Sequence, residues 1–289
     1  MRILFFCLPA AALLSAFPAP AADVHSGFFT TSDGVRLHYL ETGSGPALFF
    51  EPGWTMPAEI WQSQIDYFSR TRHVVALDPR SQGQSQQTAD GNYCDRRARD
   101  IKELVDHLNL APVALVGWSM GVAETLCYVD QFGTSTLSAL VLVDGGFGRD
   151  PDPAAKVMGW RRFEELQKDR RGFTEHFVRG MYFKPHPEEY LHGVVEAALK
   201  TPTNTAVLLA ANALMKDDYR PILYRIDRPV LYTHRGANKA QGDVLRTYVP
   251  WARVEAFEDA GHALFVDDAD RFNQLLDDFL THPSMVPAR

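Results

Sequence analysis

Hydrophobic residues fall into short continuous runs separated by longer stretches with helical spacing. The runs predict buried strands at residues 47–50, 73–77, 113–116, 139–143, 229–233 and 253–257. The stretches between them predict helices at residues 58–70, 95–108, 120–132 and 271–280. Strands that are apolar on both faces and alternate with helices are typical of a parallel sheet covered on both sides. We therefore expect an α/β domain.

Two segments depart from this alternation. Residues 28–41 predict a hairpin, because two strand-like runs flank Ser32-Asp33-Gly34 and Asp-Gly is a strong signal for a tight turn. Residues 150–220 contain no convincing strand, and their periodicity predicts helices at 154–168, 173–181, 187–199 and 203–215. We therefore expect an α/β core at 23–149 and 221–289, interrupted by a helical cap at 150–220.

The N-terminus has the layout of a secretory signal peptide. Met1-Arg2 supplies a short positive end, an apolar run follows over residues 3–17, and Ala19-Pro20-Ala21 is a small-x-small cleavage site. We expect residues 1–22 to be removed and the mature protein to be secreted or periplasmic, with no stable membrane insertion after cleavage. Export permits a disulfide between the two remaining cysteines, Cys94 and Cys127, but the core of a domain this size does not need one, so two buried thiols are favoured.

Charge and composition narrow the range of partners. A net charge of −7 argues against nucleic acid or an anionic membrane surface, because either would call for a basic surface. No glycine-rich phosphate loop appears, and His234 with His262 lacks a third ligand at a supporting spacing. We therefore expect a small-molecule ligand, no cofactor and no metal, and the oligomeric state stays open.

The segment Gly117-Trp118-Ser119-Met120-Gly121 fits the pattern Gly-x-Ser-x-Gly. It lies between a predicted strand and a predicted helix, and this context identifies a sharp turn that exposes a nucleophilic serine. The flanking glycines leave room for a strained backbone at Ser119. His262 follows Asp259-Ala260-Gly261 at the end of the last predicted strand, and we expect it to be the general base.

Four segments in this order resemble the α/β-hydrolase superfamily over nearly all of residues 26–282. They are Pro52-Gly53-Trp54, residues 78–85, the Ser119 motif and Ala260-Gly261-His262. The resemblance implies a curved, mostly parallel eight-stranded sheet with helices on both faces and an inserted helical cap. It also implies that Ser119 and His262 are catalytic, with the backbone N–H groups of Trp54 and Met120 as the oxyanion hole.

The chain departs from the family pattern at two positions. Pro52 stands where many relatives have histidine, but the expected oxyanion donor is the later Trp54 N–H. The usual place of the triad aspartate falls on Asn238, which cannot stabilise an imidazolium by charge. Asp144, at the end of the strand after the nucleophile helix, is the favoured acid, and Asp243 is the alternative.

Three further acidic positions are interpreted as non-catalytic. Glu51 is expected to be a solvated or paired carboxylate at a strand end, because that role is commoner than catalysis for such a residue. Asp259 and Asp267 are expected to be surface groups.

An apolar pocket is expected beside the serine, lined by Trp118, Phe147, Trp160, Leu264 and Phe265. The leading hypothesis is hydrolysis of carboxylic esters with apolar acyl groups through an acyl-serine intermediate, and lactones, thioesters and amides would use the same machinery. Hydrolysis of a C–C bond and cofactor-free haloperoxidase-type activity are the enzymatic alternatives. A non-catalytic ligand-binding protein of the same fold is the alternative of another class.

Overall fold

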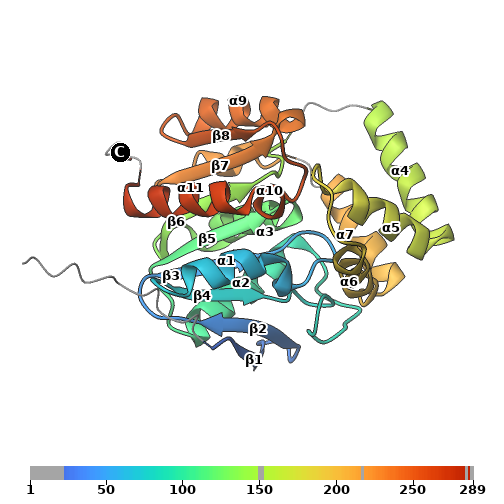
Figure 1. Cartoon of the computed structure of the whole chain (residues 1–289), viewed down its shortest axis with the longest axis horizontal. Helices are drawn as coiled ribbons and strands as arrows, with labels where there is room; N and C mark the ends of the chain where they lie inside the picture. Colours follow the sequence, from blue (N-terminus) through green and yellow to red (C-terminus); the bar gives the residue numbers. More distant parts are fainter. Residues whose placement is uncertain (1–22, 149–152, 216–217, 284–285, 287–289) are drawn as a thin grey trace, which may run out of the picture.

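An eight-stranded sheet forms the centre of the structure, a computed structural model that describes residues 23–148, 153–215, 218–283 and 286 (Figure 1). The strands are β1 (His25–Thr30), β2 (Arg36–Thr42), β3 (Ala47–Glu51), β4 (His73–Leu77), β5 (Val113–Trp118), β6 (Leu137–Val143), β7 (Val230–Arg235) and β8 (Arg253–Phe257). Their order is β1-β2-β4-β3-β5-β6-β7-β8. Only the pairs β1–β2 and β2–β4 are antiparallel. The predicted mostly parallel sheet is confirmed.

Helices cover both faces of the sheet, because alternate residues of each central strand point to opposite sides. Leu140 and Leu142 of β6 belong to the hydrophobic layer that contains α2 (Cys94–His107), α3 (Met120–Phe132), α8 (Arg220–Leu223) and α9 (Lys239–Tyr248). Val141 and Val143 belong to the opposite layer, which contains α1 (Gln62–Phe68), α10 (Leu264–Asp267) and α11 (Ala269–Thr281). The sheet therefore separates two hydrophobic layers.

Five of the described helices lie between β6 and β7, and we call the first four the cap. They are α4 (Pro153–Lys168), α5 (Arg170–Gly180), α6 (Glu188–Leu199) and α7 (Thr203–Met215). Figure 1 shows them grouped at one side of the α/β core, in yellow-green to light orange. Helix α4 packs against α7, and α5 packs against α6. Helices α5 and α6 also contribute buried residues, such as Val178 and Val194, to the hydrophobic layer that contains α1, α10 and α11.

The structure differs from the sequence prediction at two segments. Residues 58–70 divide into a 3-10 turn at Ala58–Trp61 and helix α1. Residues 239–248 form α9, although no helix was predicted there. Leu245 is fully buried and Val244 and Tyr248 pack beside it. This short apolar stripe explains the helix.

Cys94 of α2 and Cys127 of α3 form a disulfide, so the favoured expectation of two buried thiols was wrong. The predicted signal peptide at residues 1–22 lies outside the described residues. In the part of the chain that the structure describes, no helix is both long and apolar enough to span a bilayer.

Candidate active site

Ser119 occupies the tight turn between β5 and α3, with φ 57° and ψ −114°. A positive φ is uncommon for a residue with a side chain, and it persists only where the surroundings enforce it. A Cβ atom on Gly117 would lie 2.4 Å from the carbonyl oxygen of Gly121, and one on Gly121 would lie 2.7 Å from that of Glu51. Backbone therefore fills the space beside both motif glycines. The turn places Ser119 at the N-terminus of α3, where the helix dipole favours negative charge.

Ser119, His262 and Asp144 form a continuous chain of hydrogen bonds. Oγ of Ser119 is 2.8 Å from Nε2 of His262, and Nδ1 of His262 is 2.6 Å from Oδ2 of Asp144. The side chain of Asp144 is fully buried, whereas that of His262 is 15% exposed. The imidazole therefore faces the serine with one nitrogen and the acid with the other. This arrangement suits a general base whose tautomer and orientation the carboxylate sets.

The structure brings Asp144, and not Asp243, to the histidine. The side chain of Asp243 lies on α9 and is 70% exposed. Oδ1 of Asp144 accepts hydrogen bonds from Nδ2 of Asn238 at 2.8 Å and from the backbone N–H of Arg235 at 3.0 Å. Nε of Arg235 is also 3.2 Å from Oδ2. Asn238, at the expected place of the acid, instead orients the acid that is present.

The segment after β3 passes directly beside the serine. A Cβ atom on Gly53 would lie 3.1 Å from Cβ of Ser119. Trp54 follows Gly53, and Met120 is the first residue of α3. The two predicted oxyanion donors therefore belong to backbone segments adjacent to the serine. The Trp54 indole donates a hydrogen bond to the carbonyl of Ala206 in α7 at 2.8 Å, which ties this segment to the cap.

Comparison with known proteins agrees with this geometry. The family described as alpha/beta hydrolase fold matches residues 46–269, which is most of the chain. This chain is an α/β hydrolase. The match includes the segment after β3, the turn at Ser119 and the loop that carries His262, so the resemblance inferred from the sequence is confirmed.

The relatives of this α/β hydrolase bear several functional names. It is 28% identical over 274 residues to a non-heme haloperoxidase of Rhodococcus erythropolis, covering 88% of this chain and 98% of that protein. It is 29% identical over 273 residues to N-formylmaleamate deformylase of Pseudomonas putida, covering 89% and 97%. An esterase structure from Exiguobacterium antarcticum matches with a TM-score of 0.82 at 24% identity, covering 89% of this chain and 100% of that one. The relatives therefore share the fold and family of this chain and differ in the reactions that their names describe.

A cavity of about 660 Å³ opens beside Ser119 and extends under the cap. Ser119, Met120 and Asp144 border it on the side of the α/β core. Its cap side is mostly apolar, formed by Met158, Phe163, Leu166, Phe173, Phe177 and Ala210. Arg162 is the one cationic side chain among the described lining residues. The hydrolase therefore presents its serine to a mainly hydrophobic chamber.

Five residues that were predicted to line the pocket do not line it. None of Trp118, Phe147, Trp160, Leu264 and Phe265 lines this cavity. Four of them are buried in the two hydrophobic layers, and Trp160 is 52% exposed. Proximity in sequence to a catalytic residue was misleading. Trp118 is the last residue of β5 and points into the core, and Leu264 and Phe265 of α10 pack into the same hydrophobic layer. Trp118 instead donates from its indole to the carbonyl of His262 at 2.8 Å and so braces the loop of the base.

Asp267 is a site residue that the sequence interpretation placed on the surface, and this was wrong. It is 6% exposed, and its carboxylate accepts hydrogen bonds from the backbone N–H groups of Gly261 and Phe183, each at 2.7 Å. It also lies 2.9 Å from Nε2 of His186. Asp267 therefore joins the loop of His262 to the segment after α5. Its partners are distant in sequence, so no local pattern could have revealed them.

Glu51, which was expected to be solvated or paired, is not solvated but has Arg97 as a cationic neighbour at 4.0 Å. It is completely buried, and a second carboxyl group, that of Glu124, lies beside it. Among the described residues, the one group with the proximity of metal ligands is Cys94, Asp95 and Cys127. The two sulfur atoms are joined to each other, so they are not thiolate ligands.

Proposed function

We propose that this α/β hydrolase cleaves carboxylic esters with apolar acyl groups through an acyl-enzyme intermediate on Ser119. The observation that carries the proposal is the chain of hydrogen bonds from Ser119 through His262 to Asp144. Its completeness also argues against a purely ligand-binding role, for which no such alignment is required.

The geometry supports hydrolysis of an ester through an acyl-enzyme in the following steps. Oγ of Ser119 attacks the ester carbonyl carbon while Nε2 of His262 takes the hydroxyl proton, and Asp144 stabilises the imidazolium that forms. The carbonyl electron pair moves to oxygen, where the N–H groups of Trp54 and Met120 stabilise the negative charge. When the intermediate collapses, His262 returns the proton to the leaving alkoxide. Water then attacks the acyl carbon while His262 takes its proton. Collapse of this second intermediate releases the carboxylic acid, and His262 returns the proton to Ser119.

The chamber supports an apolar substrate of moderate size. Its cap side presents Phe163, Phe173 and Phe177 with aliphatic neighbours, and burial of such surface contributes about 25 cal/mol per Å². Esters of medium-length or aromatic acids therefore fit the lining better than strongly charged substrates. Amides belong in the same test, because a relative of similar length is named N-formylmaleamate deformylase.

A second candidate activity is formation of a peracid from the same acyl-enzyme. The full-length similarity to a protein named non-heme haloperoxidase favours it. Hydrogen peroxide would replace water as the nucleophile, forming the bond to the acyl carbon and releasing Ser119 with its proton restored. The reaction needs an added peroxide and no change in the groups that act on the ester.

The proposal includes export of the mature protein. The leader-like pattern at residues 1–22 motivates it, and the Cys94–Cys127 disulfide suits an oxidising compartment. N-terminal sequencing of protein from the extracellular or periplasmic fraction should begin at Ala22 or Asp23. An intact N-terminus on soluble intracellular protein would contradict export.

The decisive experiment is a substrate panel with the purified mature protein. It should contain p-nitrophenyl esters of increasing acyl length, a lactone, an anilide, a diketone, and acetate with hydrogen peroxide and bromide. We expect ester turnover to exceed turnover of every other substrate, and Ser119→Ala to abolish it. Diketone cleavage without ester turnover would instead support the C–C hydrolase alternative.

A further inference from the structure

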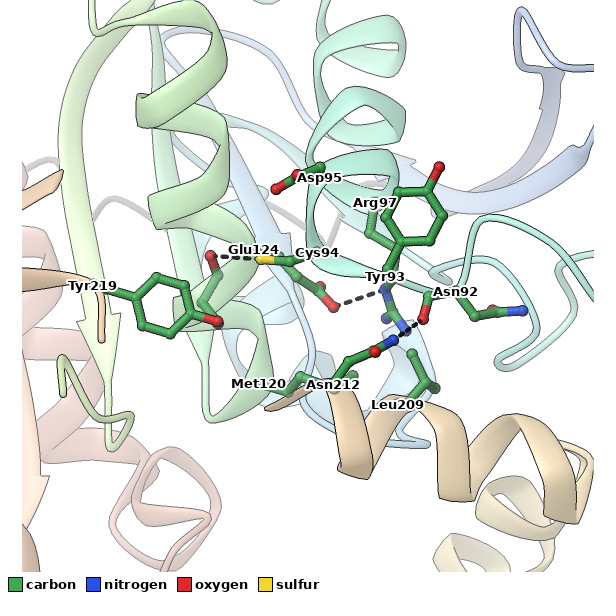
Figure 2. A pocket seen from close by; sticks show the side chains of 11 residues that line it. Asn92, Tyr93, Cys94, Asp95, Arg97, Met120, Glu124, Leu209, Asn212 and Tyr219 are labelled. Atoms are coloured by element: carbon green, nitrogen blue, oxygen red, sulfur yellow. Dashed lines mark hydrogen bonds and ion pairs between the residues drawn. The ribbon is translucent and has the colours of Figure 1, made fainter. Parts of the chain in front are cut away.

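A second cluster of charged side chains lies behind the nucleophile turn. It consists of Glu51 at the end of β3, Arg97 of α2 and Glu124 of α3, each at most 2% exposed. Nε of Arg97 is 2.7 Å from Oε1 of Glu124, and Nη2 of Arg97 is 4.0 Å from Oε1 of Glu51. Figure 2 shows Arg97 and Glu124 at the edge of a smaller pocket of about 250 Å³, which shares Met120 with the main cavity.

The cluster has more acid than base. Burial raises the pKa of Glu51 well above its usual range, and the neighbouring Glu124 and Asp100 raise it further, whereas Arg97 opposes the shift. Burial also raises the pKa of Glu124. One retained proton would make the cluster neutral. A buried ion pair of this kind contributes little net stability. Stability alone therefore does not explain the cluster, and Arg97 has a further contact on its other side.

Arg97 reaches the segment after β3 through Gln82. Its Nη2 donates to Oε1 of Gln82 at 3.0 Å. Nε2 of Gln82 donates to the carbonyls of Gly53 at 3.1 Å and Met56 at 2.8 Å, and Oε1 accepts from the backbone N–H of Thr55 at 3.2 Å. One buried amide therefore binds both ends and the interior of the turn that contains Trp54.

This turn is a strained segment that needs external support. Thr55 has φ 59°, a conformation that β-branched residues rarely adopt, and its side chain is fully buried. The N–H of Met56 donates to the carbonyl of Gly53 at 3.2 Å and closes the turn. Gly53 lies against Ser119, as described above. A shift of the turn would therefore move the Trp54 N–H relative to the reacting carbonyl.

We propose that Arg97 is a positioning residue for the oxyanion hole. It holds Gln82, and through Gln82 the turn at residues 53–56, so that the Trp54 N–H faces the developing oxyanion. Glu124 fixes Arg97 to the nucleophile helix, which carries the Met120 donor, so the two donors keep a constant separation. This inference rests on the proposed ester hydrolysis, because it assigns the cluster to stabilisation of that tetrahedral intermediate.

The test replaces the whole cluster by apolar residues. Arg97→Met alone would leave two carboxyl groups buried side by side, so it is combined with Glu51→Leu and Glu124→Leu, a change that preserves the folding of other proteins. We expect an unchanged or higher Tm and a kcat for p-nitrophenyl butyrate reduced about 10- to 100-fold, with KM within about twofold. Arg96→Met is the matched control on the same helix, because Arg96 pairs with Asp100 and Glu103 and does not contact the turn. Its kcat should match wild type.

Gln82→Met provides an independent test, because it removes the amide contacts without changing any charge. We expect the same loss in kcat at constant KM. Arg97→Lys should be intermediate, since an ammonium group lacks the fork that contacts Gln82 and Glu124 together. Wild-type kcat in a folded triple variant or in folded Gln82→Met would overturn the role of Arg97. If wild type itself hydrolyses no ester, the proposed function and this inference both fail.

Discussion

Two acidic centres flank the turn that carries Ser119, and they differ in how their carboxyl groups are satisfied. Asp144 is buried but accepts hydrogen bonds from Asn238 and from the backbone of Arg235, and it contacts His262 at 2.6 Å. Glu51 is equally buried, but its neighbours are a second carboxyl group, that of Glu124, and the more distant Arg97 at 4.0 Å. The first centre borders the main cavity, whereas Arg97 and Glu124 of the second border the smaller pocket.

The difference teaches what each centre can do. A carboxylate with several donors is held in one orientation and can compensate the positive charge that develops on an imidazole. A carboxyl group with few donors and an acidic neighbour retains its proton more strongly, so it serves packing and positioning. Burial alone therefore does not identify the catalytic acid, whereas the pattern of donors does.

The largest expected effect comes from the first centre. Asp144→Asn should lower kcat by about 10⁴-fold, because the amide would hold the imidazole in the wrong tautomer and supply no charge. Ester hydrolysis under saturating conditions measures this loss. Asp243→Asn is the matched control and should leave kcat unchanged. A severe loss in Asp243→Asn with an active Asp144→Asn would reverse the assignment of the acid.

Removal of the disulfide should destabilise the second centre without altering the first. Cys94 and Cys127 join α2 and α3, which carry Arg97 and Glu124, and they close a loop with a sequence separation of 33. The double variant Cys94→Ala/Cys127→Ala should lose about 3–4 kcal/mol of unfolding free energy, or roughly 10 °C in Tm. Calorimetry with and without dithiothreitol checks this. The prediction would be contradicted if dithiothreitol left the Tm of wild type unchanged and the double variant had the Tm of wild type.

A smaller effect is expected at the donor that orients the acid. Asn238→Leu removes the hydrogen bond to Oδ1 of Asp144 and leaves the one from the Arg235 backbone. Loss of one bond to a charged group should reduce kcat roughly tenfold. A paired measurement of Tm separates this from unfolding, because Asn238 is only partly buried. An effect on KM alone would mean that Asn238 contacts substrate and does not orient Asp144.

The smallest effect concerns the pH dependence of stability. Burial raises the pKa of Glu51 in the folded state. The stability that the protonated carboxyl group contributes is therefore fully present below the unfolded-state pKa near 4.3, and it is lost as pH rises through the folded-state pKa. Glu51→Gln mimics the protonated carboxyl group and should keep this stability at every pH. The Tm of Glu51→Gln should therefore exceed that of wild type by a few degrees at alkaline pH and by less near pH 5. Glu59→Gln, at an exposed position, is the control and should show no such trend.

The fold followed from local patterns because each pattern has a direct structural cause. Continuous apolar runs became the central parallel strands, and helical spacing became the layers that cover them. Ser119, Asp144 and His262 could be paired in advance, since all three follow strands whose carboxyl ends meet at one edge of a parallel sheet. Helix α9 was missed because its apolar stripe is short.

The lining of the cavity and the buried acidic residues around the site could not be predicted from local sequence patterns. Phe173 and Phe177 enter the cavity because α5 of the cap packs over the core, and residue spacing does not specify how two clusters of helices meet. Asp267 and Glu51 gain their roles from partners distant in sequence. Their burial reverses the usual expectation for an acidic residue.

The most direct test of the account is the covalent capture of Ser119. Mature protein incubated with a fluorophosphonate should gain the mass of one phosphonyl group, and peptide mass spectrometry should locate it on Ser119. Asp243→Asn should be labelled as wild type is, whereas Ser119→Ala should remain unlabelled. Absence of an adduct on active wild-type enzyme, or an adduct at another residue that persists in Ser119→Ala, would contradict the assignment of the nucleophile.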